Sequence, residues 1–99
     1  MSKIQEIIDD LNRRKKAVSC DGSTGLLIIL QSIGFTFKDS KTLGHRVFTH
    51  KKLSEISEFT THSIDCGHKP KREMRFQYVQ KTISLLNKYK NELEAINEE

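Results

Sequence analysis

The chain contains no tryptophan and one proline, and aromatic residues make up 7% of its 99 residues. Few large rings are available to fill a core, so the length predicts one small domain with one modest core. The longest apolar run, LLIIL at 26–30, is far shorter than the roughly 20 residues that cross a bilayer. The N-terminal stretch MSKIQEIIDD is acidic and amphipathic, so we expect no secretory signal and no membrane association.

The sequence has only two cysteines, Cys20 and Cys66. Without a secretory signal we expect both to be free thiols in a reducing cytoplasm, and a disulfide between them is the alternative. Together with His62 and His68 they also offer four metal-capable side chains. Their spacing lacks the close cysteine pairs of structural zinc sites, so we predict no metal and no cofactor.

Positive charge is concentrated in the middle of the chain. The net charge is +4. Residues 38–81 hold twice as many basic as acidic side chains and all of the histidines, whereas the last residues are mainly acidic. A basic region of this kind favours a polyanionic partner such as RNA. The alternative is the ordinary solvated surface of a basic protein.

Hydrophobic periodicity predicts two helices, three strands and one long final helix. They cover residues 3–16, 19–35, 35–40, 45–52, 59–66 and 71–99. We expect a side-chain cap at the start of the second helix, a left-handed glycine, Gly34, at its end, and a loop or a brief turn over 53–58. The final helix should bury one apolar stripe and fray after residue 91.

This order predicts an α+β two-layer sandwich of the form α-β-β-β-α, with an extra N-terminal helix over 1–18 before a domain over 19–99. Short connections favour a three-stranded antiparallel sheet with both major helices on one face and the other face open. Strand periodicity places His45, Val47 and Thr49 on one face, with Arg46 and Phe48 on the other.

Three stretches occur in this order before the long final helix: LLIILQSIGF, GHRVFTH and TTHSIDCGHKPK. In these stretches and their order the chain resembles the HicA toxins of HicA–HicB toxin–antitoxin systems. The resemblance covers roughly residues 20–90. His45, Phe48 and His50 fit the family's strand of the form His-x-hydrophobic-Phe-x-His. Leu43-Gly44 stands where the family has Gly-Ser, and the N-terminal helix is additional.

The resemblance implies a fold like that of double-stranded-RNA-binding domains and metal-independent cleavage of messenger RNA in the cytoplasm. It also implies a HicB-like antitoxin protein as partner and assigns the family's catalytic histidine to His45. Histidine exchanges protons near neutral pH, and Lys and Arg stabilise the charge that develops on a phosphate. The residues expected to bind RNA are Lys41, Gly44, Arg46, Lys51, Lys52, His68, Lys69, Lys71 and Arg72.

Two other function classes remain open from the sequence. The first is a non-catalytic RNA-binding module on the same fold, in which His45 is only an exposed polar residue of a strand. The second is an interaction domain that binds a protein through its sheet face or its first helix. His50 and His68 are expected to be structural or close to phosphate rather than catalytic.

Overall fold

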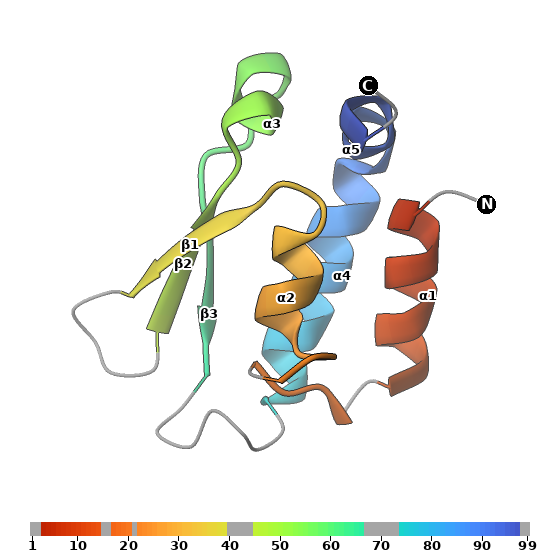
Figure 1. The fold of residues 1–99 in the computed structure, drawn as a ribbon, viewed down its shortest axis with the longest axis vertical. Helices are drawn as coiled ribbons and strands as arrows, with labels where there is room; N and C mark the ends of the chain where they lie inside the picture. Colours follow the sequence, from red (N-terminus) through yellow and green to blue (C-terminus); the bar gives the residue numbers. More distant parts are fainter. Residues whose placement is uncertain (1–2, 15–16, 21, 40–44, 67–73, 98–99) are drawn as a thin grey trace.

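The computed structural model describes residues 3–14, 17–20, 22–39, 45–66 and 74–97, and it has the α+β fold that the sequence predicts (Figure 1). The elements are α1 (Lys3–Arg14), α2 (Leu26–Gln31), β1 (Thr36–Asp39), β2 (His45–Thr49), α3 (Lys51–Ile56), β3 (His62–Asp65), α4 (Phe76–Lys88) and α5 (Lys90–Asn97). The strands form an antiparallel sheet in the order β1-β2-β3. Helices α2 and α4 lie on one side of this sheet, and α1 packs behind α4 (Figure 1).

The two faces of the sheet differ as strand periodicity predicts. Phe48 on β2 and Ile64 on β3 are fully buried under the helices. His45 and Val47 alternate with them, and the register places these two opposite Asp65 and Ser63. These polar and half-buried side chains therefore lie together on the sheet face away from the helices, which we call the open face.

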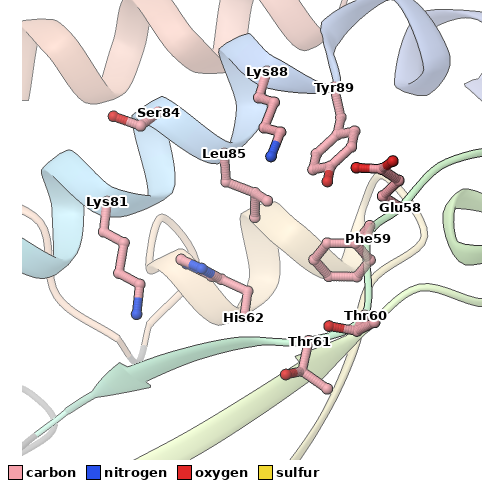
Figure 2. Close-up of a pocket in the computed structure, with 10 residues that line it drawn as sticks. All are labelled: Glu58, Phe59, Thr60, Thr61, His62, Lys81, Ser84, Leu85, Lys88 and Tyr89. Carbon is pink, nitrogen blue, oxygen red and sulfur yellow. The ribbon is translucent and has the colours of Figure 1, made fainter.

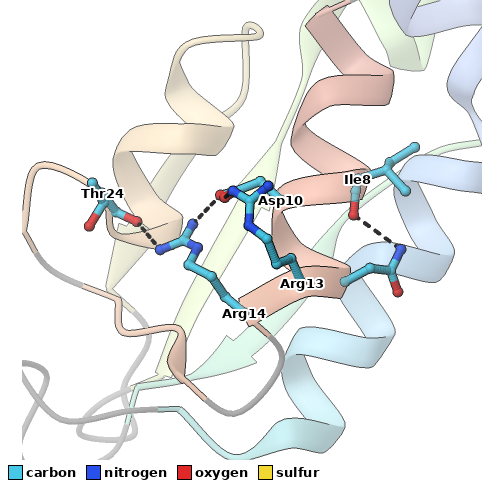
Figure 3. Close-up of polar contacts among 6 residues, drawn as sticks. Ile8, Asp10, Arg13, Arg14 and Thr24 are labelled. Atoms are coloured by element: carbon cyan, nitrogen blue, oxygen red, sulfur yellow. Dashed lines mark hydrogen bonds and ion pairs between the residues drawn. The ribbon is translucent and has the colours of Figure 1, made fainter.

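Helix α1 belongs to the same core as the rest of the chain. Ile4, Ile8 and Leu11 are 0 to 3% exposed and join the core cluster through contacts of α1 with α4 and α5. The C-terminal end of α1 is also tied to the loop before α2. Arg14 donates a hydrogen bond to the carbonyl oxygen of Thr24 at 2.9 Å and pairs with Asp10 at 2.6 Å (Figure 3). The first helix therefore covers the outer side of the helical layer.

The prediction of two free thiols is wrong. Cys20 and Cys66 form a disulfide that joins the loop before α2 to the end of β3. The same loop caps α2 with backbone groups: the N–H groups of Leu26 and Leu27 donate to the carbonyls of Ser19 and Cys20. The expected side-chain cap is therefore not needed, and the helix begins after Gly25 with none.

The loop or brief turn predicted over 53–58 is also wrong, because a short helix, α3, begins directly after β2. His50 caps this helix: its Nδ1 accepts a hydrogen bond from the backbone N–H of Leu53 at 3.2 Å. Its Nε2 donates to the carbonyl oxygen of Ile33 at 3.0 Å. The next residue, Gly34, has a φ of +100°, which confirms the predicted left-handed end of α2. His50 is therefore a structural residue that links two elements.

The predicted single final helix is divided at Tyr89, whose φ of −107° and ψ of 20° separate α4 from α5. Tyr89 is buried against Phe59, and the turn lets α5 contact α1 and α3. Phe76, expected in the buried stripe, is 37% exposed, and the described helix continues to Asn97 rather than fraying after residue 91. No helix in the described ranges is long and apolar enough to cross a membrane.

Reducing the disulfide should destabilise the fold strongly. The two cysteines are 46 positions apart, and closing a loop of that length reduces the entropy of the unfolded chain by an amount worth about 4 kcal/mol. Urea unfolding with and without a phosphine reductant measures this loss. The Cys20→Ala/Cys66→Ala double variant is the control and should not respond to the reductant. Two reactive thiols per chain in protein purified without reductant would contradict the disulfide.

Candidate functional site

His45 and Asp65 form a pair across the open face. The register of β2 and β3 places them directly opposite each other, and Nε2 of His45 lies 3.6 Å from a carboxylate oxygen of Asp65. The side chains are 38% and 26% exposed, so both are accessible to a ligand. This separation is within the range of an ion pair with a protonated histidine but is too long for a hydrogen bond. A carboxylate facing one ring nitrogen orients the imidazole and leaves the other nitrogen for proton exchange.

Among the described residues of the open face, one basic side chain lies near this pair, beside Val47 and several hydroxyl side chains. Lys38 on β1 is exposed and lies opposite Val47, which makes it a diagonal neighbour of His45 at roughly 7–8 Å. The hydroxyls of Thr36 and Thr49 form a hydrogen bond of 3.0 Å farther along the same strands. The open face therefore carries a histidine, its carboxylate partner and a nearby cation.

Arg46 is not part of this group. It lies on the opposite face of β2, where its Nε forms an ion pair with Asp39 at 2.9 Å across β1 and β2. Its guanidinium also donates to the backbone carbonyl of His45 at 3.3 Å. Because the charge of Arg46 is compensated by Asp39 on the helix side, Arg46 and His45 do not face one phosphate together.

Lys51 and Lys52 are also separate from His45. They form the first turn of α3, beyond the other end of β2, and both are exposed. Five strand steps of about 3.3 Å put His50 roughly 16 Å from the position of His45. The two lysines therefore cannot bind the phosphate on which His45 would act. The other predicted RNA-binding residues lie outside the described ranges: Lys41, Gly44, His68, Lys69, Lys71 and Arg72.

Two residues of the open face, Lys38 and Asp65, are not among the site residues predicted from the sequence. Lys38 belongs to the basic region of the sequence, and its alternation with Phe37 on β1 is the signal that places it away from the core. Asp65 has no sequence signal that pairs it with His45, because only the β2–β3 register brings the two together.

His62, on the helix side of β3, lines a pocket of about 290 Å³ between residues 58–62 and α4, with Tyr89 at one end (Figure 2). The Thr82 hydroxyl donates to the carbonyl of Tyr78 at 2.9 Å, so its oxygen accepts from His62 Nε2 at 2.8 Å. Burial and, second, the charge of Lys81 lower the pKa of His62 from 6.5 to about 4. His62 is therefore a neutral hydrogen-bond donor near neutral pH.

A zinc site at the cysteines and histidines would have no thiolate ligands in this structure. Cys20 and Cys66 are bonded to each other, and His62 uses Nε2 to bind Thr82. Within the described ranges, no group of three or more His, Cys, Asp or Glu side chains has the geometry to hold a metal ion.

Comparison of the chain with protein-family models, with curated proteins and with solved structures gives no match in any of the three. The residues themselves and the geometry of the open face are therefore the basis for assigning a function.

His62 should make the protein less stable in mild acid. Its pKa is lower in the folded chain than in the unfolded chain, so the unfolded state binds more protons as the pH falls from 6.5 towards 4. The contribution of His62 to the free energy of unfolding is fully present above about pH 6.5, and roughly 2 to 3 kcal/mol of that contribution is lost by pH 4.5. Urea unfolding at several pH values measures this change.

The His62→Gln variant is the control for this prediction, because glutamine can keep a hydrogen bond to Thr82 but does not titrate. Its unfolding free energy should fall less steeply over the same pH range. Equal slopes for the variant and the wild type would contradict a buried, neutral His62.

Proposed function

We propose that this protein is a HicA-like ribonuclease that cleaves messenger RNA on its open face, with His45 as the proton-transferring group. The observation that supports this most is the pairing of His45 with Asp65 on an accessible sheet face, with Lys38 as diagonal neighbour. An imidazole oriented by a carboxylate and close to a cation is suited to general acid–base chemistry on a phosphodiester.

In the proposed reaction, His45 takes the proton from a ribose 2′-hydroxyl through the ring nitrogen that does not face Asp65. The 2′-oxygen attacks the adjacent phosphorus, and the bond from phosphorus to the 5′-oxygen of the next nucleotide breaks. The leaving 5′-oxygen gains a proton from a water molecule at the accessible face. The products are a 2′,3′-cyclic phosphate and a 5′-hydroxyl end. Asp65 stabilises the positive imidazolium, and Lys38 stabilises the charge on the phosphate oxygens.

The second candidate is an RNA-binding module that uses the same face without cleavage. One observation favours it: in the described part of the chain, His45 is the single histidine on the open face, since His50 and His62 are buried on the helix side. The described residues thus provide one proton-transferring imidazole where the reaction needs a base and an acid. In this candidate, binding would survive the loss of His45.

The proposal includes a HicB-like antitoxin protein that covers the open face, and a cytoplasmic location where messenger RNA is present. A sheet face with an exposed histidine and lysine is a surface that such a partner could cover to block RNA. The disulfide counts against a reducing compartment, because disulfides are typical of oxidising ones. A cytoplasmic protein would therefore have to fold with the two cysteines reduced, or keep the bond against the thiol pool.

Cleavage of a labelled messenger RNA in EDTA tests the proposal. We expect the wild type to cut, and we expect His45→Ala to lower the rate by about 10²- to 10⁴-fold while RNA binding stays within a few-fold. Asp65→Asn should lower the rate less than His45→Ala and change the pH profile, because it alters the orientation and charge of the pair. Products ending in 2′,3′-cyclic phosphate would support the mechanism.

Matched variants separate this site from general positive charge. Lys38→Gln should slow cleavage, whereas Lys90→Gln on α5 removes an equal charge away from the open face and should have no effect. If no RNA is cut but wild type and His45→Ala bind it equally, the RNA-binding module is correct. If His45→Ala cuts at the wild-type rate, the assignment of His45 is wrong.

A further inference from the structure

A groove on the helix side of the molecule, distinct from the open face, lies between α4 and the chain that leads into β3 (Figure 2). Two contacts fix how these segments run past each other. His62 bonds Thr82 at one end, and the rings of Phe59 and Tyr89 lie 5.8 Å apart at the other. The residues before β3 therefore run antiparallel to α4, with the pocket of about 290 Å³ along them.

The groove runs along residues 58–62 and reaches β3 at its first residue, His62, and β3 is at the edge of the sheet. Among the described strands, β3 is paired with β2 on one side and with none on the other. Alternate backbone N–H and C=O groups of an edge strand point outward and can pair with another chain. Edge strands are commonly protected by proline or lysine, and the sequence TTHSID at 60–65 contains neither.

Helix α4 places two positive charges over this edge. Lys81 and Lys88 both line the pocket, and they are seven positions apart, which is about 10.5 Å along a helix. Leu85 lies between them and lines the same pocket. The helix therefore presents a cation, an apolar side chain and a second cation in a row along residues 58–62, up to the first residue of β3.

We propose that this groove binds an extended acidic segment of a partner protein, which adds to the sheet as a fourth strand beside β3. Every second side chain of such a strand would face α4. Residues four apart are about 13 Å apart in a strand, a span that two flexible lysines 10.5 Å apart can match. The recognised pattern is thus acidic–x–apolar–x–acidic, with the outer carboxylates at Lys81 and Lys88 and the apolar residue at Leu85.

The groove suits a peptide better than a nucleic acid. An RNA backbone has no alternating N–H and C=O groups to pair with the edge of β3, and it carries a phosphate on every nucleotide. For these phosphates the pocket lining supplies two lysines, Lys81 and Lys88. His62 adds no positive charge near neutral pH, and the rings of Phe59 and Tyr89 favour apolar side chains.

The test uses a fluorescein-labelled peptide of sequence Thr-Thr-Glu-Val-Leu-Val-Glu-Thr-Thr, whose two glutamates and leucine share one strand face. Fluorescence anisotropy should show binding to the full chain and its loss when both glutamates are replaced by glutamine. Lys81→Gln and Lys88→Gln should each weaken binding roughly 2- to 5-fold, which corresponds to exposed ion pairs. Lys90→Gln, outside the pocket and paired with Glu94, is the matched control and should bind like the wild type.

A second measurement distinguishes strand addition from loose charge attraction. Hydrogen exchange followed by NMR should show slower exchange of β3 amides in the presence of the peptide, with no change on β1. Equal binding of the glutamine peptide, equal weakening by Lys90→Gln or unchanged exchange on β3 would each overturn the proposal. It would also be overturned if double-stranded RNA displaced the peptide competitively, or if sedimentation showed that a second copy of the chain fills the edge. His45→Ala should bind the peptide normally, so this test is independent of the proposed ribonuclease activity.

Discussion

The register between β2 and β3 is the constraint on which the functional site depends. It places His45 opposite Asp65, and a shift of one residue would send Asp65 to the helix side and bring Ile64 or Cys66 opposite His45. Burial holds this register, because the same pairing puts Phe48, Ile64 and His62 under the helices. The stability of the core and the geometry of the open face are therefore two results of one alignment.

Both ends of this strand pair are held by contacts from elsewhere in the chain. The disulfide fixes the end of β3, one residue after Asp65, to the loop before α2. At the other end His50 binds the carbonyl of Ile33 and caps α3, and a Cβ added at Gly34 would lie 2.6 Å from its Nε2. A glycine is thus required there by space as well as by backbone conformation. These contacts anchor the two strands that carry His45 and Asp65, and the proposed proton transfer needs such fixed positions.

The alternation of β2 and the apolar helix stripes could be predicted from sequence, because each depends on one segment and its period. The disulfide, the His45–Asp65 pair and the Asp39–Arg46 pair could not, since each joins segments whose relative position depends on the whole fold. The expected role of Arg46 beside His45 fails for a different reason. The two residues are adjacent in the chain, which suggested one phosphate site, but neighbouring residues of a strand point to opposite faces. Helix α3 was missed because its cap is a histidine rather than one of the usual capping residues.

The central claim is that RNA meets the protein on the open face, at His45 and Asp65. The most direct measurement is an NMR titration with a short RNA whose riboses are 2′-O-methylated, so that it can bind but cannot be cleaved. The account predicts that the backbone amides of Lys38, Val47 and Ser63 shift on binding, while those of α1 and α5 do not. Shifts confined to α1, α4 or α5 would contradict it and would place the RNA on the helical side of the sheet.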